Sequence, residues 1–328
     1  MKADIDLKDK KILYLLLENG RLNNSKIASL VGVSKNTVAS RIAKLKESGV
    51  IRDFMPTLNY DKLGLFTYDI FLRLRATEKQ EKAVIEYFSK HPNVIWASSM
   101  FGKWDIFAQL LAPNIEDLEV VLKDVLNFLG KRLEAYQINP IVDRFKIDHQ
   151  LFDFSKEIKY KFKEKKAGRD RVKMDELDKK IISCMNHGFG RASYFEIGKK
   201  IGASMETVRN RVLALQKKNI ISHHMTFVNL QKLGFHEYIV FATLRNLTHE
   251  KEQELMKFIR LDNRIRIGFK TIGKFEFYFY VVVHEPKELE RFVRDLKNNF
   301  FDILLETDYS TLTNEFRLCF FPKSLERL

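Results

Sequence analysis

The sequence holds few of the residues that build metal, redox or catalytic sites. Its 328 residues include two cysteines, Cys184 and Cys319, in unrelated parts of the second half. A cysteine-based metal site is therefore all but excluded, and we expect no disulfide between them. The sequence also shows no nucleophile motif, no glycine-rich phosphate loop and no ligands at metal spacing. We therefore expect a binding protein and not an enzyme, with no catalytic residue, metal or cofactor.

Long apolar runs are also missing. No uninterrupted stretch reaches the roughly 18 residues that a membrane-spanning helix needs. The first residues, MKADIDLKDKK, lack the apolar core of a signal peptide. These two absences predict a cytoplasmic protein with no membrane partner.

Charge, by contrast, is abundant and one-sided. The chain has 57 lysines and arginines against 43 aspartates and glutamates, a formal net charge of +14. A content of 45% hydrophobic and 30% charged residues is typical of a folded globular protein. The basic excess favours a polyanionic partner such as nucleic acid.

Residues 32–51, GVSKNTVASRIAKLKESGVI, predict a helix with its entry turn. Gly32 tolerates the positive φ of a tight turn, Ser34 is a good N-cap, and Gly49 ends the helix. An inward apolar stripe recurs at helical spacing, formed by Val38, Ile42 and Leu45. The opposite face carries groups suited to phosphates and base edges, namely Lys35, Asn36, Ser40, Arg41 and Lys44. Taken alone, the pattern fits an ordinary amphipathic surface helix equally well.

The chain contains this segment twice, which favours the nucleic-acid interpretation. Residues 202–221, GASMETVRNRVLALQKKNII, repeat its spacing without gaps. Upstream, IDLKDKKIL is matched by MDELDKKII, and downstream GKWD at Gly102 is matched by GKFE at Gly273. The repeat covers nearly the whole chain and divides it into halves of about 160 residues, close to common domain size.

Each half predicts a helix-turn-helix followed by a wing. In the first half we expect a helix over residues 5–19, a second over SKIASLV capped by Asn24 or Ser25, and the helix after Gly32. The run VIRDFMPTLNY alternates like a strand and would form the wing, with Pro56 confining it to a sheet edge. In the second half, His223 and His224 fall on the corresponding wing, and we interpret them as surface residues.

From Thr67 the pattern becomes that of a ferredoxin-like plait. Strands are expected at TYDIFLRLRA, VIWASSMF, WDIFAQLLA and LEAYQINPIVDRFKI, with helices at EKQEKAVIEYFSKH and NIEDLEVVLKDVLNFL. The order is β-α-β-β-α-β, and the second half repeats it, with FEFYFYVVV as a buried strand.

The expected fold class is therefore α+β, with two winged helix-turn-helix domains alternating with two ferredoxin-like βαββαβ domains. The predicted boundaries are 1–62 and 174–232 for the former, 63–150 and 233–328 for the latter, and 151–173 for a basic linker. Ile158, Tyr160 and Phe162 alternate with lysines, as in an exposed strand. We interpret the linker as a solvated tether; the alternative is a basic strap lying along DNA.

This layout resembles the Lrp/AsnC (feast/famine) family of prokaryotic transcription regulators. The likeness is carried by Asp6, Asp9, Ile12-Leu13, Ile27-Ala28, Gly32, Ser34, Thr37-Val38, Arg41-Ile42, Leu45, Gly49-Val50-Ile51 and the Gly102/Asp105 hairpin. It implies a DNA-binding N-terminal domain and a plait, the RAM-type domain, that pairs subunits. In many members the plait also holds a small effector such as an amino acid near a Gly-x-x-Asp hairpin. That implies an effector site at Gly102, Trp104, Asp105, Gly273, Phe275 and Glu276.

The chain departs from the family in two ways. It carries the whole order twice, and Glu276 stands where the family usually has aspartate, with Lys103 and Lys274 as additional cations. If the plaits pair, the cheapest partner for one is the other on the same chain, because tethering raises the effective concentration. We therefore expect an intramolecular pseudo-dimer, with association into a higher homo-oligomer left open. Trp104 and Phe275 would pack in the interface between the plaits.

The predicted partner is double-stranded DNA, held by two non-identical heads that suit half-sites about 34 Å apart or a multiple of it. The candidate contacts are Ser34, Lys35, Asn36, Thr37, Ser40, Arg41 and Lys44 in the first head and Ser204, Glu206, Arg209, Asn210 and Arg211 in the second. Asn36 or Asn210 could pair with adenine and Arg209 with guanine, whereas Glu206 would accept from cytosine and repel phosphate. We therefore expect an asymmetric site, or a first head that dominates. Arg41 and Arg211 are either phosphate contacts or partners in salt bridges within their domains.

Two other interpretations compete with a regulator. Siroheme decarboxylases resemble the same two-domain layout but would need a pocket rich in arginine and histidine for the tetrapyrrole, and no arginine run surrounds Met100-Phe101-Gly102. The second alternative is a fused scaffold whose second helix-turn-helix is purely structural.

Overall fold

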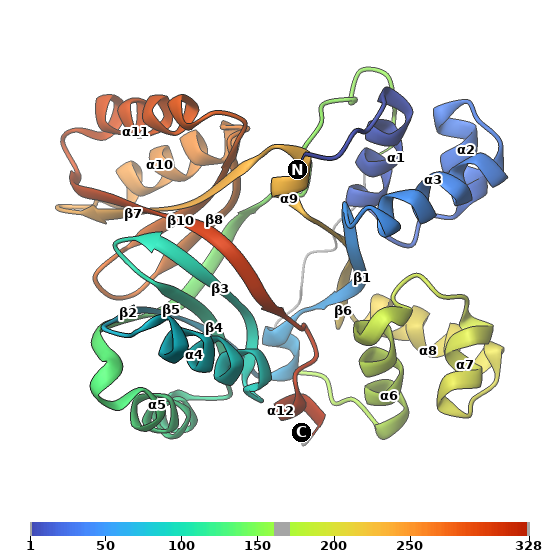
Figure 1. Cartoon of the computed structure of the whole chain (residues 1–328), viewed down its shortest axis with the longest axis horizontal. Helices are drawn as coiled ribbons and strands as arrows, with labels where there is room; N and C mark the ends of the chain where they lie inside the picture. The colour runs from blue at the N-terminus through green and yellow to red at the C-terminus, as the bar shows by residue number, and fades with distance from the viewer. Residues whose placement is uncertain (1, 161–170, 327–328) are drawn as a thin grey trace. The chain divides into compact units, whose positions relative to one another are not determined.

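The computed structural model describes residues 2–160 and 171–326, which divide into two compact units (Figure 1). The first unit combines the residues up to 64, residues 149–234 and the C-terminal residues from 325; the second combines 65–148 and 235–324. Both helix-turn-helix segments thus lie in the first unit and both plaits in the second. No helix within the described ranges has the length and apolar character that crossing a membrane requires.

The first head comprises three helices and a wing strand: α1 (Leu7–Glu18), α2 (Asn24–Val31), α3 (Lys35–Glu47) and β1 (Ile51–Leu58). Gly32 adopts a φ of 72° between α2 and α3, and Val38, Ile42 and Leu45 are buried beneath α3, as the sequence predicts. The predicted N-cap of α2 is wrong. Asn23 takes this role in place of Asn24 or Ser25, because its side-chain oxygen accepts from the Lys26 backbone N–H at 2.7 Å.

The second head repeats this arrangement with one local difference. It comprises α6 (Glu176–Cys184), a π turn η3 (Met185–Phe189), α7 (Tyr194–Ile201), α8 (Met205–Lys217) and β6 (Ile221–Val228). The second head has one residue more than the first between the cap of its first helix and the cap of its third. The chain leaves helical geometry within η3, at His187 (φ −117°) and Gly188 (φ 86°), so this kinked turn accommodates the extra residue.

The two wings pair with each other. β1 and β6 form a two-stranded antiparallel sheet running from Ile51 opposite Val228 to Leu58 opposite Ile221. Each strand of such a sheet keeps one unpaired edge, which suits the missing N–H of Pro56. Short helical turns, η1 (Tyr60–Leu63) and α9 (Leu230–Leu233), follow the wings.

His223 and His224 on β6 are buried, with 7% and 3% exposure, so the prediction that they are surface residues is wrong. The reason is that β6 packs against α1 of the other head. The Gly20 N–H donates to the His224 carbonyl at 2.7 Å, and the Thr226 hydroxyl donates to the Leu16 carbonyl at 2.6 Å. Within its own head, the Nε2 atom of His224 lies 2.7 Å from the side-chain nitrogen of Gln216 on α8.

The first part of the linker, residues 151–160, forms turns and bends instead of the expected strand. Ile158 is buried, as is Phe154, whose ring lies edge-on to Tyr14 with 5.8 Å between centroids. Lys11 on α1 pairs with Glu157 at 2.6 Å. The tether interpretation is therefore wrong for this segment, which packs on α1. Residues 161–170 of the linker lie outside the described residues, and beyond them the Val172 N–H donates to the Lys62 carbonyl at 2.8 Å.

The second unit contains both β-α-β-β-α-β orders, which confirms the predicted fold class. The first plait consists of β2 (Phe66–Leu74), α4 (Glu78–Lys90), β3 (Val94–Gly102), β4 (Ile106–Ala112), α5 (Ile115–Leu129), η2 (Gly130–Arg132) and β5 (Leu133–Ile147). The second consists of β7 (His236–Leu244), α10 (His249–Leu261), β8 (Ile265–Thr271), β9 (Phe277–Val283), α11 (Pro286–Phe300) and β10 (Leu304–Leu318), and α12 (Lys323–Glu326) follows.

The strands of the two plaits join into one closed sheet in the order β10-β3-β4-β2-β5-β8-β9-β7. The two long strands make the joints. β5 pairs with β2 through residues 133–140 and with β8 through residues 141–147. β10 pairs with β7 through residues 304–311 and with β3 through residues 310–318. Each long strand therefore belongs to both plaits.

Aromatic side chains from both plaits fill the space where they meet. Trp104 and Phe275 are buried in one apolar cluster with Phe71, Phe107, Phe241 and Tyr278. Their predicted place in the plait interface is confirmed, and so is the burial of β9. Separate apolar clusters lie between each half of the sheet and its own helices.

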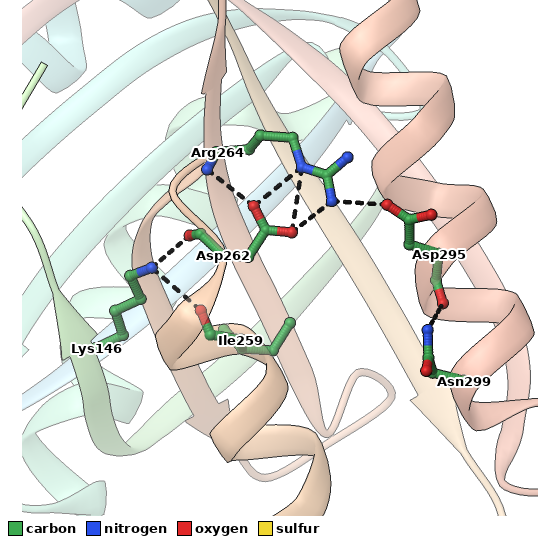
Figure 2. Close-up of polar contacts among 6 residues, drawn as sticks. All are labelled: Lys146, Ile259, Asp262, Arg264, Asp295 and Asn299. Atoms are coloured by element: carbon green, nitrogen blue, oxygen red, sulfur yellow. Dashed lines mark hydrogen bonds and ion pairs between the residues drawn. The ribbon is translucent and has the colours of Figure 1, made fainter. Parts of the chain in front are cut away.

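Each long strand also sends a cation to the end of a helix in the other plait. Lys146 on β5 donates to the carbonyl oxygens of Ile259 at 3.1 Å and Asp262 at 2.5 Å, at the C-terminus of α10 (Figure 2). A positive charge is favourable there because it complements the helix dipole. Arg264 joins Asp262 to Asp295 on α11, at 2.5 and 2.8 Å (Figure 2). Arg317 on β10 does the reciprocal work in the first plait, donating to the Ser89 carbonyl of α4 at 2.9 Å.

Candidate nucleic-acid interface

The outer face of α3 presents the side chains that the sequence singles out. Lys35, Asn36, Ser40 and Lys44 are all exposed. Ser34 caps the helix, because its hydroxyl oxygen accepts from the Thr37 backbone N–H at 3.0 Å. The first turn of α3 is thus capped, and the two lysines and the amide of Asn36 are exposed to solvent.

Arg41 lies on α3 and turns towards α1. Its Nη1 is 2.7 Å from Asp6 and 2.8 Å from Asp9, the two residues of the capping box that starts α1. These two hydrogen bonds raise the pKa of Arg41. The backbone N–H of Asp9 lowers the pKa of Asp6, and Arg41 adds to that effect. Of the two alternatives for Arg41, the structure shows the salt bridge within the domain.

Arg211 in the second head makes the matching contact. Its Nη1 is 2.5 Å from Asp175 and 3.4 Å from Asp178, which form the capping box of α6. The repeated Asp-x-x-Asp at the start of each first helix thus has a structural role, because it joins the first helix of the head to the third.

A hollow of about 630 Å³ lies between the start of the chain and α3. Five candidate contacts and three acids line it: Asn36, Thr37, Ser40, Arg41, Lys44, Asp4, Asp6 and Asp9. The lining thus carries three negative charges, on Asp4, Asp6 and Asp9, against the two positive charges of Arg41 and Lys44. In the second head Lys173 stands at the place of Asp4. Helical periodicity does not predict that these acids lie beside α3, because they belong to the start of the chain.

The second head presents a different surface. Glu206, Arg209 and Asn210 are exposed on α8, and the Ser204 hydroxyl caps the helix by accepting from the Thr207 N–H at 3.0 Å. Glu206 lies in the first turn, where a negative charge also favours the helix dipole. The two heads therefore share a frame but differ in the charge they expose.

The hairpin residues expected to hold an effector have partners in the protein. The Asp105 carboxylate accepts from the Leu74 N–H at 2.7 Å, and Glu276 accepts from the Leu244 N–H at 2.9 Å. The longer glutamate thus performs the same bond as the aspartate it replaces. Gly102 and Gly273 have φ values of 125° and 131°, as turn residues of the two hairpins.

The remaining hairpin side chains are largely enclosed. Trp104 and Phe275 are 6% and 1% exposed, and the indole N–H of Trp104 is buried with no hydrogen-bond partner among the described residues. Lys103 pairs with Asp308, and its ammonium lies 5.4 Å from the centroid of the Phe275 ring. The added cation of the first hairpin is therefore already engaged.

One repeated motif was missed. The dipeptide Gly-Arg occurs at residues 20–21 and again at residues 190–191, at the same place in each head. Its recurrence in two otherwise different turns was the available signal. Elsewhere in the described ranges, His, Cys, Asp and Glu side chains form no group of three that could hold a metal ion, and both cysteines are free thiols.

Three segments of the chain match models of known protein families. Residues 5–52 match a winged helix-turn-helix DNA-binding model, residues 174–216 an AsnC-type helix-turn-helix domain, and residues 69–146 an Lrp/AsnC ligand binding domain. An HTH-type transcriptional regulator of Pyrococcus abyssi is 30% identical over 149 residues, which are 45% of this chain and 98% of that protein. The chain belongs to the Lrp/AsnC family. It is a DNA-binding transcription regulator of this type, in tandem duplicated form.

Two further proteins are similar to this chain. An HTH-type regulator of Pyrococcus horikoshii is 35% identical over 120 residues, 36% of this chain and 74% of its own length. Among solved structures, the siroheme decarboxylase NirDL matches 98% of this Lrp/AsnC chain and 96% of its own, with a TM-score of 0.64 and 16% identity. At that identity the likeness shows a shared fold and nothing about activity.

Proposed function

We propose that this Lrp/AsnC regulator binds double-stranded DNA with both heads at once, as an intramolecular pseudo-dimer on an asymmetric operator. The observation that carries the proposal is the pairing of β1 with β6, which makes the wings of the two heads one sheet. Both recognition helices consequently belong to one compact unit. The closed sheet formed by both plaits adds a second union of the two halves. As a prokaryotic regulator it would act in the cytoplasm, where the chromosome lies.

The contacts we assign follow from charge and exposure. In the first head, Lys35 and Lys44 bind phosphates, and Asn36 pairs with adenine. The hydroxyls of Ser34, Thr37 and Ser40 lie near the start of α3 and add contacts to the sugar-phosphate backbone of the DNA. None of these proposed contact groups is negatively charged, whereas the second head presents Glu206. The first head therefore supplies the larger share of the affinity for DNA.

In the second head, Arg209 would read guanine and Asn210 adenine, with Ser204 near the backbone. Glu206 accepts from cytosine and repels phosphate, so it favours one base at the cost of general affinity. Arg41 and Arg211 contribute by holding each recognition helix in place through their aspartate pairs. The two half-sites therefore differ in sequence and in strength.

A small effector is the second part of the proposal. It would bind at the hairpin of Gly102, Trp104 and Asp105, where an acceptor atom on the ligand would satisfy the buried Trp104 N–H. At the second hairpin, formed by Gly273, Phe275 and Glu276, phenylalanine replaces the indole and offers no donor. We therefore expect one effector per chain. A thermal-shift screen of amino acids against the wild type and Trp104→Phe tests this, because only the wild type should respond.

Selection of bound duplexes from a random pool, followed by footprinting, tests the DNA proposal. We expect a protected region with two unlike half-sites about one helical turn apart, or a multiple of it. A perfect palindrome filled by one chain would count against the asymmetric operator. Replacing Arg209 and Asn210 by alanine should weaken binding of the second half-site; unaltered binding would mean that the second head is a scaffold.

The shared fold with NirDL favours one alternative, a tetrapyrrole enzyme. That assignment needs cationic groups for the carboxylates of the macrocycle, and no arginine run surrounds Met100-Phe101-Gly102. Adding iron uroporphyrin to the chain separates the two functions. An unchanged visible spectrum together with a salt-sensitive mobility shift on DNA supports the regulator, and a new bound-haem spectrum would support the enzyme.

A further inference from the structure

The Gly-Arg dipeptides at residues 20–21 and 190–191 reach across from each head to the other. The guanidinium of Arg21 donates to the carbonyl oxygens of Gly190 at 2.7 Å and Ala192 at 2.9 Å. Arg191 returns the contact, donating to the Leu22 carbonyl at 2.7 Å, to the Asn24 side chain at 2.7 Å and to the Gly20 carbonyl. The exchange is reciprocal and uses both ends of each guanidinium.

The glycines let the turns come close enough for this exchange. A methyl group on Gly190 would overlap the carbonyl oxygen of Phe54, on the wing of the first head. A methyl group on Gly20 would lie 2.9 Å from the carbonyl oxygen of His224, on the wing of the second head. Each turn thus lies directly on the opposite wing, and a side chain at either position would push the heads apart.

Both arginines are held by neutral groups. Within the described residues, neither arginine forms an ion pair, and the rings of Tyr194 and Phe54 lie over Arg21 and Arg191 at 4.9 and 5.4 Å. Burial lowers the pKa of both, that of Arg191 to about 10, and the charge of Arg21 adds to the effect on Arg191. A buried charge that loses a hydrogen-bond partner incurs an uncompensated desolvation penalty. A shift of one head relative to the other would leave these charges without carbonyl partners, so the arrangement tolerates little displacement.

We propose that Gly20-Arg21 and Gly190-Arg191 form a reciprocal clasp that fixes the separation and angle of the two recognition helices, and thereby selects the spacing of the half-sites. Arg21 and Arg191 are positioning residues in this account; neither needs to touch DNA. The inference rests on the proposed function, because it requires that both heads bind one duplex together.

Binding of the full chain to duplexes of altered spacing tests the clasp. The operator is the one selected with the wild type, and its half-sites are moved apart by about 5 or about 10 base pairs, half a turn or a whole turn. The wild type should bind about 100-fold more weakly after the half-turn insertion, because the tethered second head can no longer engage. In Arg21→Ala/Arg191→Ala, the penalty should shrink to less than about tenfold, since loosened heads adapt to both spacings.

Further variants separate positioning from direct contact. Lysine keeps the charge but lacks the planar fork, so Arg21→Lys/Arg191→Lys should lose spacing discrimination as the alanine variant does. Gly190→Ala reaches the same end by steric displacement. Arg73→Ala, which removes an arginine on β2 of the second unit, is the matched control and should keep the wild-type penalty. Unchanged binding to a single half-site shows that each variant is folded.

Several outcomes would overturn the clasp. Variants that keep the wild-type spacing penalty would do so. Uniform weakening at every spacing, a salt slope lower by about one and rescue by lysine would make these arginines phosphate contacts. If the wild type itself binds one half-site as tightly as two, the proposed function fails, and the clasp as a selector of spacing fails with it; the wild-type arm alone reveals that result.

Discussion

Acid should destabilise the first unit through His224. This imidazole lies on β6, and burial lowers its pKa to about 3, with the charge of Arg21 and the neighbouring His223 adding to the effect. In the unfolded chain the pKa returns to about 6.5. Between these two values the unfolded state binds a proton that the folded state does not bind. The stabilising effect of the neutral imidazole is therefore fully present above pH 6.5 and is lost as the pH falls towards 3.

The magnitude follows from the size of the shift. Each pH unit within this window changes the free energy of unfolding by about 1.4 kcal/mol. At pH 4.5 the loss is about 2.7 kcal/mol from this one residue, a large share of a typical domain's stability of about 5–15 kcal/mol. Burial also lowers the pKa of His223, which acts with the same sign.

Urea unfolding at pH 7 and pH 4.5, followed by hydrogen exchange in α1 and β6, measures the effect. In His224→Gln the side chain stays neutral and polar, so the difference between the two pH values should shrink by about 2.7 kcal/mol. His249→Gln, at an exposed position on α10, is the control and should behave like the wild type. Equal pH dependence in His224→Gln and the wild type would refute the reasoning, as would an NMR titration of His224 near pH 6.5.

Three further predictions concern single residues. Arg41→Ala should lower the free energy of unfolding by at most about 1 kcal/mol, because its aspartate pairs are partly exposed, and it should leave the salt slope of DNA binding unchanged. A slope reduced by about one would instead identify a phosphate contact. Glu206→Asn gives the second head the residue that the first has at position 36, and should tighten binding of the second half-site severalfold in a mobility shift. No change would mean that Glu206 points away from DNA. Asp69 is fully buried, and burial raises its pKa to about 7, while Gln109 and Tyr278 donate to it. The folded state therefore keeps a proton that the unfolded state releases above about pH 4. The free energy of unfolding of the second unit should thus fall by about 1.4 kcal/mol per pH unit from there to pH 7. Asp69→Asn should remove this pH dependence in thermal unfolding, and an unaltered profile would show that Asp69 is ionised.

Local signals made much of the fold predictable. A positive-φ glycine, a serine cap and an apolar stripe specify the turn and helix at Gly32 and Ser34 without reference to the rest of the chain. Alternation and turn residues specify the β-α-β-β-α-β order for the same reason. The exposed face of α3 follows from helical periodicity, so the candidate contacts Lys35, Asn36 and Lys44 could be listed from sequence.

Contacts between distant segments could not be predicted in this way. The burial of His223 depends on α1 of the other head, and the partners of Arg41 lie at the start of α1. The periodicity of β5 shows a long strand but does not reveal that its two ends pair with different plaits. The repeated Gly-Arg dipeptide is legible as a repeat, yet its contacts depend on how two heads dock.

The closed sheet has a consequence for how the two halves can diverge. In a dimer of identical chains, every buried side chain is present twice and must suit both copies of its surroundings. Here Asp69 has Ile239 as its repeat counterpart, and its partner Tyr278 has Phe107, so the acid and its phenol occur once, beside a largely aromatic cluster. Because the two halves are fused in one chain, neither has to pack against an identical copy of itself. A substitution in one half therefore changes the interface between the plaits at one place instead of two. The same holds for the two recognition helices, α3 and α8, whose exposed residues can diverge independently while the two heads keep the same fold.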